Sequence, residues 1–344
     1  MKLVKKLLVI SLCLVMVFAL AACGGAPDTT DDNAANAEPI TIRIAHTEPS
    51  VGTINQACEE FKSWIEEASA GGITVELYPD GSISGSDADL AEAAATGTIE
   101  FSVSATSALT NYSDKFGMLD MPFLFDDEQA AFNAVDGDFG AALNSTLSGT
   151  GLTILGYSFN GVRETTNNVR PITQPDDFKG IKMRAMQSPT HIGMYEAYGA
   201  NATPMSFGEV YTGLQQGTVE GQDNPVDVIY NQQFQEVQKY LSLTNHNYGF
   251  MAIIANEGWY TGLSEENRAL VDQGIKECML DFERNLKISE TEDYIQKLTD
   301  AGMEVNEITP ENHQKFVEAV QPLHEEYAAI FGQELFDLAA SYNK

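Results

Sequence analysis

The chain has 344 residues, of which 19 are basic and 50 are acidic, and its formal net charge at pH 7 is −31. Such a surface repels nucleic acids and anionic lipid headgroups, which excludes both as binding partners. The length exceeds what one hydrophobic core usually holds and suits two.

The N-terminus predicts export. Three lysines precede an apolar run over 7–20, which is shorter than the ~20 residues of a membrane-spanning helix and ends in Leu-Ala-Ala-Cys. This order is typical of a bacterial lipoprotein signal, so we expect removal of residues 1–22 and a lipid on Cys23. An ordinary signal peptide with an incidental cysteine is the alternative. Cleavage removes three of the 19 basic residues and none of the 50 acids, which gives a mature charge of −34.

A short polar segment separates this signal from the folded part. Residues 23–39 are small, polar and acidic, which predicts a disordered tether. Two further cysteines follow, Cys58 and Cys278, each on the apolar face of a helical pattern. Buried free thiols are the simpler interpretation, although an exported protein also permits a disulfide between them.

Strands and helices then alternate. We expect strands at 40–46, 73–79, 99–105 and 152–159, and helices at 53–68, 87–96 and 128–147. Ser86 is a predicted N-cap, and Gly137 is expected to break the third helix. Strand–helix alternation of this kind predicts parallel βαβ units.

The pattern restarts after Arg163. We expect strands at 181–184, 201–203, 218–221, 240–244 and 250–255, and helices at 189–198, 207–216 and 225–232. A long helical pattern over 265–299 lacks proline and is a candidate to span two lobes. Thr309 and Pro310 then begin a C-terminal helix. The sequence thus predicts two α/β lobes, with the chain crossing between them more than once.

Sequence templates for catalysis and metal binding do not fit. A zinc helix beginning at His324 has Ala328 where its second histidine belongs. The nucleophile-elbow template ends in Asn160 instead of glycine, and a calcium-loop template has Leu147 in place of its last carboxylate. Five scattered histidines have no metal spacing, and no glycine-rich phosphate loop is present. We therefore expect no catalytic residue, no metal and no cofactor.

Arginine is scarce and clustered. Three of the six arginines, Arg163, Arg170 and Arg184, lie within 163–184. A guanidinium group can hold a carboxylate with two parallel hydrogen bonds, but internal salt bridges are an equally simple use of it. Nearby, Ser206–Glu209 fits a capping box, and Phe207 within it is suited to a core or to the floor of a ligand pocket.

The residues around these arginines carry a family pattern. Three segments are characteristic, "NGVRETTNNVRPITQPDDFKGIKMRAM", "GANATPMSFGEVYTGLQQGTVEGQDNPVDVI" and "FQEVQKYLSLTNHNYG", with "IRIAH" and "DMPFLF" before them. They resemble the substrate-binding proteins of TRAP transporters, the tripartite ATP-independent periplasmic carriers of organic acids. The resemblance implies an α/β, two-lobe periplasmic-binding-protein-like fold, with the ligand cleft between the lobes and a long helix spanning both. We expect 40–160 plus about 249–288 in lobe I, and 161–248 plus about 289–344 in lobe II.

The resemblance also implies site residues. Arg184, in a K-x-R element, would hold the ligand carboxylate, and Arg163 and Asn224 would support it in the cleft. Phe207 would line the pocket. Asp223 stands where relatives often have glutamate, and Arg163 is its natural ion-pair partner.

Substrate identity in this family is set by loops of the first lobe. The candidate residues follow the first and third strands: His46, Thr47, Glu48, Ser104, Ala105 and Thr106. His46 could equally cap the end of its strand. Relatives that bind sialic acid carry an acidic and a basic residue near the third-strand loop, where this chain has Ala105 and Ala108. A smaller or more apolar monocarboxylate or dicarboxylate is therefore expected, and Arg170, beside Pro171, is expected to be structural.

The resemblance implies a function as well. The expected protein is an extracytoplasmic, monomeric solute-binding protein, attached to the membrane through lipid on Cys23. It would capture an organic acid and deliver it to the small and large membrane subunits of a TRAP permease, without catalysis. Presentation of the ligand to a sensor or chemoreceptor is one alternative, and an extracellular hydrolase on the same fold is another.

Overall fold

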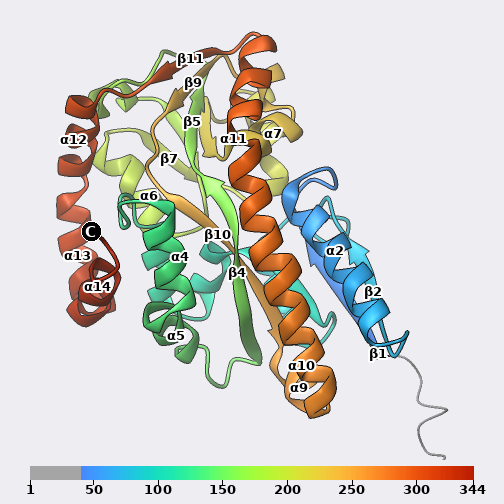
Figure 1. Cartoon of the computed structure of the whole chain (residues 1–344). Helices are drawn as coiled ribbons and strands as arrows, with labels where there is room; N and C mark the ends of the chain where they lie inside the picture. Colours follow the sequence, from blue (N-terminus) through green and yellow to red (C-terminus); the bar gives the residue numbers. More distant parts are fainter. Residues whose placement is uncertain (1–39) are drawn as a thin grey trace, which may run out of the picture. The chain divides into compact units, whose positions relative to one another are not determined.

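Two β-sheets organise residues 40–344, the part of the chain that this computed structural model describes (Figure 1). The strand order is β2-β1-β3-β10-β4 in the first sheet and β11-β9-β5-β8-β6-β7 in the second. The strands of the first sheet are β1 Ile40–His46, β2 Ile73–Tyr78, β3 Phe101–Ala105, β4 Leu152–Val162 and β10 Tyr248–Asn256. Those of the second are β5 Glu164–Asn167, β6 Lys182–Ala185, β7 Asn201–Pro204, β8 Gly221–Asn224, β9 Tyr240–Leu243 and β11 Glu304–Glu307. The predicted two-lobe α/β fold is confirmed.

Helices cover both sheets. Around the first sheet lie α2 Thr53–Ala68, α3 Asp87–Ala95, α4 Glu128–Asp136, α5 Asp138–Ser145, α9 Glu257–Gly262 and α10 Glu265–Gly274. The others are α6 Pro189–Ala197, α7 Val210–Gln215, α8 Val226–Asn231, α11 Glu283–Asp300, α12 Pro310–Ala319, α13 Gln321–Phe331 and α14 Gln333–Ala340. No helix among the described residues is long and apolar enough to cross a membrane. The predicted signal, lipidated cysteine and tether (1–39) lie outside the described residues.

Many helix boundaries lie where caps and glycines in the sequence predicted them. Helix α2 has the predicted bounds, and Gly137 separates α4 from α5. The Ser86 hydroxyl accepts the backbone N–H of Asp89 at the start of α3. The Thr309 hydroxyl likewise caps α12. In the first sheet β1 pairs in parallel with both β2 and β3, as strand–helix alternation predicts.

Three short strands of the second sheet differ from the prediction. Strand β8 begins at Gly221, three residues later than expected, because Gly217 has a φ of +69° and belongs to the turn that ends α7. Strands β5 and β11 were not predicted at all. All four residues of β5 and of β8 are buried, and most are polar. Their hydrogen bonds, rather than an apolar alternation, explain why they lie inside.

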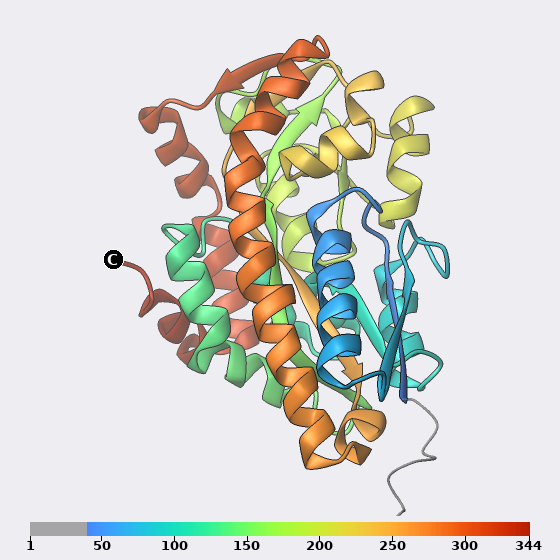
Figure 2. The same cartoon turned by 45° about the vertical axis from the view of Figure 1, so that its right-hand side comes forward.

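One long helix packs against both lobes. Helix α10, a π-helical segment (Ile275–Phe282) and α11 follow one another without a break, and Figure 2 shows them passing beside both sheets. The π-helical segment contacts α2 of the first lobe, and α11 contacts α8 of the second. The predicted helix spanning both lobes is therefore present. Cys278 in this helix and Cys58 in α2 are buried free thiols, as the simpler interpretation proposed.

The chain crosses between the sheets at closely spaced points. Strand β4 ends at Val162 and β5 begins at Glu164, so Arg163 alone joins a strand of the first sheet to a strand of the second. Residues 244–247 make the return crossing from β9 to β10. The backbone N–H of Arg163 donates to the carbonyl of Asn247 at 2.9 Å. The two crossings are thereby tied together.

Candidate functional site

A cavity lies between the two sheets. Its lining residues come from both lobes: Glu48, Asp87, Ala88, Ala105, Ser107, Ala108, Asn111, Asn160, Arg163, Arg184, Met186, Gln187, Met205, Ser206, Phe207 and Asn224. Six of the predicted candidates are among them: Arg163, Arg184, Phe207, Asn224 and the loop residues Glu48 and Ala105. Their contact with a ligand stays a prediction.

Arg184 is a buried cation without a counter-ion. It lies in β6 and is 4% exposed, and its Nε donates to the carbonyl oxygen of Met205 at 3.1 Å. Within residues 40–344 no carboxylate oxygen comes within 4.0 Å of its guanidinium nitrogens. Burial, together with the positive charge of Arg163, lowers the pKa of Arg184 to about 10. An anion entering the cavity would relieve this uncompensated charge.

Arg163 already has a carboxylate partner. Its Nε donates to Oδ2 of Asp223 at 2.5 Å, and its Nη2 donates to the backbone carbonyl of Asp223 at 2.5 Å. The predicted Arg163–Asp223 ion pair is confirmed. Because Asp223 uses these two guanidinium donors, Arg163 contributes to the cavity mainly a positive potential and its remaining N–H groups.

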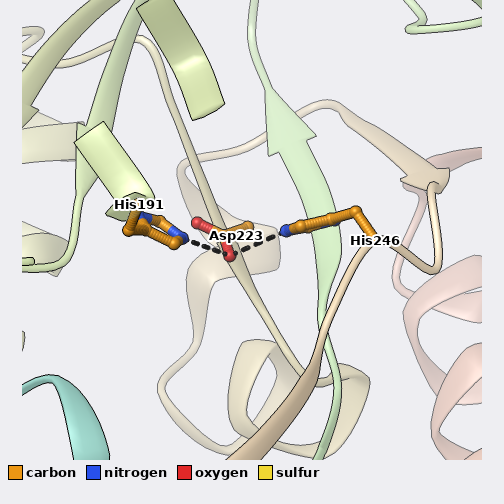
Figure 3. Close-up of side chains that lie close together, drawn as sticks. All are labelled: His191, Asp223 and His246. Carbon is orange, nitrogen blue, oxygen red and sulfur yellow. Dashed lines mark hydrogen bonds and ion pairs between the residues drawn. The ribbon is translucent and has the colours of Figure 1, made fainter. Parts of the chain in front are cut away.

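Asp223 is the centre of a buried hydrogen-bond cluster. Figure 3 shows His191 and His246 pointing at it from opposite sides, each with its Nε2 at 3.1 Å from Oδ2. The Tyr195 hydroxyl donates to Oδ1 at 2.8 Å. Burial alone would raise the pKa of Asp223, but the charge of Arg163 and the ring N–H groups hold it well below its usual range.

His191, Asp223 and His246 have the spacing of a metal site, with ligand atoms within 4.8 Å of one another. The hydrogen bonds do not suit a metal. Nδ1 of His191 accepts the backbone N–H of Met186 at 3.1 Å, so Nε2 carries the proton and donates to Asp223. That nitrogen has no lone pair to offer, and the Arg163 guanidinium on the same oxygen would repel a cation. We interpret the cluster as the support that fixes Arg163.

Asn224 and Phe207 come from neighbouring elements of the second lobe. Nδ2 of Asn224, in β8, donates to Oε1 of Gln222 at 2.6 Å, which fixes the amide at the cavity wall. Phe207 is half-buried and packs partly on the core of the second sheet. The carboxylate of Glu209 accepts the backbone N–H of Ser206 at 3.2 Å, as the capping motif predicts. This cap directs Phe207 to the rim, so it serves both the core and the cavity.

Five predicted candidates do not line the cavity: Asp223, His46, Thr47, Ser104 and Thr106. Asp223 lies behind it, in the cluster described above. His46 is fully buried and pairs through Nε2 with Oδ1 of Asn55 at 3.2 Å, and burial lowers its pKa to about 4. This matches the alternative interpretation of a strand-end histidine. Thr106 is 2% exposed, whereas its neighbours Ala105 and Ser107 line the cavity.

Several lining residues were missed from the sequence. Asp87 is the first residue of α3, where an acidic side chain is common. Met186 and Gln187 directly follow β6, and Asn160 lies near the end of β4. The rule that ligands bind beyond the carboxyl ends of strands points to the turn around Arg184, and Met186 and Gln187 lie in that turn although neither was named.

Arg170 has the structural role expected of it. Its side chain is exposed, and Nε and Nη2 donate to the backbone carbonyls of Asp177 and Lys179, each at 2.9 Å. It closes the loop before β6 and does not line the cavity.

The two lobes touch at the cavity rim through two glycines. The backbone N–H of Gly208, beside Phe207, donates to the carbonyl of Gly85 at 3.0 Å. A Cβ atom on Gly208 would lie 3.0 Å from Cα and 3.1 Å from the carbonyl oxygen of Gly85. A larger side chain at Gly208 would therefore press on the backbone of Gly85.

We expect Gly208→Val to weaken ligand binding by about five-fold to a hundred-fold, because overpacking by roughly 1–3 kcal/mol would act on the closed form. The melting temperature without ligand should stay nearly unchanged, since Gly208 is exposed. Gly262→Val is the matched control, because nothing lies within 4 Å of a Cβ there. Calorimetry that finds equal affinity in both variants would contradict a closing contact at Gly208.

Comparison with known proteins shows the family of this chain. The family model of DctP, bacterial extracellular solute-binding protein family 7, matches residues 44–330. The chain is 32% identical over 305 residues to the 2,3-diketo-L-gulonate-binding periplasmic protein YiaO of Escherichia coli (strain K12), covering 89% of this chain and 90% of that protein. It is 31% identical over 300 residues to the C4-dicarboxylate-binding periplasmic protein DctP of Rhodobacter capsulatus, covering 87% and 89%.

A solved structure extends the agreement to the fold. The sugar acid binding protein DctPAm from Advenella mimigardefordensis strain DPN7T, in complex with galactonate, is similar with a TM-score of 0.85 and 31% identity. The similarity covers 89% of this chain and all of that one. As the resemblance in the sequence implied, the chain belongs to the DctP family of bacterial extracellular solute-binding proteins.

Proposed function

We propose that this protein captures an organic acid by its carboxylate and delivers it unchanged to the small and large membrane subunits of a TRAP permease. One observation carries the proposal: Arg184 is 4% exposed, lines the cavity and has no carboxylate within 4.0 Å among the described residues. A buried charge without a partner is strongly unfavourable, so the site is suited to an anionic ligand.

Each lining residue has a distinct part in this proposal. Arg184 holds the ligand carboxylate with two parallel hydrogen bonds. Asn224 donates to the same group, Arg163 adds positive potential, and Phe207 packs on the carbon chain. Closure of the lobes removes water from around the ion pair and strengthens it.

The remaining predictions belong to the same proposal. Removal of residues 1–22 and lipid on Cys23 would hold a monomeric protein outside the cytoplasm, with 23–39 as its tether. The lobes would take 40–160 plus about 249–288, and 161–248 plus about 289–344. This division assigns the Arg184 side of the cavity to lobe II.

Matched pairs of ligands test the carboxylate requirement. Titration calorimetry on the mature protein would compare gluconate with gluconamide and succinate with succinamide. At least one acid should bind with one-to-one stoichiometry, and its amide should bind a hundred-fold more weakly or not at all. Amides that bind as tightly as their acids, or a failure of both acids and of a wider set of carboxylates to bind, would overturn the proposal.

A further inference from the structure

The cavity wall opposite the arginines is acidic. Glu48 follows β1 and Asp87 begins α3, so both belong to the first lobe, whereas Arg184 and Asn224 belong to strands of the second. Across the described residues, neither acid has an oxygen within 4.0 Å of a guanidinium nitrogen. In the described chain Arg184 and the two acids, Glu48 and Asp87, therefore line the same cavity but form no ion pair across it.

The carboxyl group of Glu48 has no hydrogen-bond partner among the described residues. Glu48 is 5% exposed, and its carboxyl group makes no hydrogen bond to any residue in the range 40–344. Lys287 is buried nearby but is paired with Asp227 at 2.5 Å and lies beyond 4.0 Å of Glu48. Asp87 accepts a hydrogen bond from the Thr47 hydroxyl at 3.1 Å. Buried polar groups are nearly always hydrogen-bonded, so an unpartnered carboxyl in a cavity indicates a polar group on the ligand.

The charges in the cavity determine which polar group fits. Asp223 offsets one of the two guanidinium charges, and the ligand carboxylate offsets the other. No positive charge of the two arginines is then left to offset the carboxylate of Asp87. A second ligand carboxylate beside Asp87 would add like-charge repulsion in a site shielded from water. Burial also raises the pKa of Glu48 to about 8 and that of Asp87 to about 6. These raised pKa values indicate that burial disfavours negative charge on both carboxyl groups of this wall.

Hydroxyl groups meet these requirements. A hydroxyl can donate to a carboxylate and accept from a protonated carboxyl, so it pairs with either acid in either form. Asn160, in the same cavity, is 4% exposed and its Oδ1 also lacks a partner in the described chain, which offers a further acceptor. Ser107 and Asn111 extend this polar wall.

We infer that the ligand is a monocarboxylate with several hydroxyl groups, of the sugar-acid class, whose hydroxyls contact Glu48 and Asp87. This inference rests on the proposed function, because it takes the carboxylate to lie at Arg184. The relatives do not decide the matter, since one is named for a C4-dicarboxylate and another was solved with a sugar acid. It also departs from the more apolar ligand that Ala105 and Ala108 led us to expect.

Calorimetry at constant pH with related six-carbon acids tests the inference in the wild-type protein. The probes are the aldonates gluconate and galactonate, the matching diacids glucarate and galactarate, and hexanoate, with succinate and an α-amino acid (glutamate) beside them. At least one aldonate should bind ten-fold or more tightly than its diacid, than succinate and than glutamate. Hexanoate should bind at least a hundred-fold more weakly than that aldonate.

A charge-neutral variant separates specificity from folding. In Glu48→Gln/Asp87→Asn the wall keeps its shape and hydrogen-bonding capacity but loses its negative charge. The affinity for succinate relative to the preferred aldonate should rise at least ten-fold. Glu164→Gln is the matched control, because Glu164 is equally buried, has its pKa raised to about 8 by burial and lies outside the cavity. That variant should leave the ratio unchanged, whatever it does to stability.

The outcomes distinguish this inference from the proposed function. If succinate, a diacid or glutamate binds the wild type more tightly than every aldonate, or if the double variant leaves the ratio unchanged, the inference is overturned while carboxylate capture stands. If none of these acids nor a wider set of carboxylates binds, the proposed function fails and the inference fails with it.

Discussion

Arg184→Ala is expected to weaken ligand binding by about a hundred-fold to a few thousand-fold. Removing one partner of a buried, hydrogen-bonded charge pair costs roughly 3–5 kcal/mol, and every 1.4 kcal/mol is ten-fold in affinity. Arg184 qualifies because it is buried and its only recorded hydrogen bond within the described chain goes to the carbonyl of Met205. Calorimetry with a ligand that the wild type binds measures the loss directly.

Arg170→Ala is the matched control for this result. Arg170 comes from the same cluster of arginines but donates to backbone carbonyls in an exposed loop, so the affinity should be nearly unchanged. Arg184→Lys keeps the charge and loses the planar fork, and its affinity should fall between those of the wild type and Arg184→Ala. A loss of less than ten-fold in Arg184→Ala, or a comparable loss in Arg170→Ala, would show that the carboxylate is held elsewhere.

The second large effect concerns stability. Asp223→Asn should lower the free energy of unfolding by roughly 3–5 kcal/mol, because it leaves the guanidinium of Arg163 buried without its counter-charge. The substitution keeps the size of the side chain, so no cavity contributes to the loss. Urea unfolding of the ligand-free protein, followed by fluorescence and by circular dichroism, measures the change.

An exposed ion pair serves as the reference for Asp223. Glu304 pairs with Lys239 at 3.1 Å, and both side chains are more than half exposed. Surface pairs of this kind contribute up to about 1 kcal/mol, so Glu304→Gln should stay within that range. Equal losses in the two variants would mean that the Asp223 cluster does not hold the crossing between the lobes.

Local signals in the sequence were sufficient for most elements of the first lobe. Apolar periodicity placed α2, and a cap at Ser86 placed the start of α3, because both signals depend on neighbouring residues alone. The short strands β5 and β8 were missed or shifted because their residues are mostly polar and are buried by long-range hydrogen bonds. Nothing within either segment shows that the other lies beside it.

The residues of the site also divide into those that the sequence could predict and those that it could not. Composition and spacing left the arginines open between salt bridges and ligand binding, and only the family pattern favoured Arg184. The pairing of His191 and His246 on Asp223 joins residues far apart in the chain, so no local pattern could reveal it. Glu48 was named among the loop candidates, whereas Asp87 was not, because an acid in the first turn of a helix already has a sufficient local explanation.

The two walls of the cavity belong to different lobes, and this bears on the order of steps in ligand binding. Arg184 and Asn224 lie on strands of the second sheet, and Arg163 is the residue that joins the sheets, so all three stay together when the lobes separate. An incoming anion can therefore dock on the open second lobe before Glu48 and Asp87 arrive. Under the proposed function we expect binding to have two kinetic steps, a salt-sensitive encounter set by the second lobe and a concentration-independent closing step set by the first. We expect selection among acids to take place in the closing step.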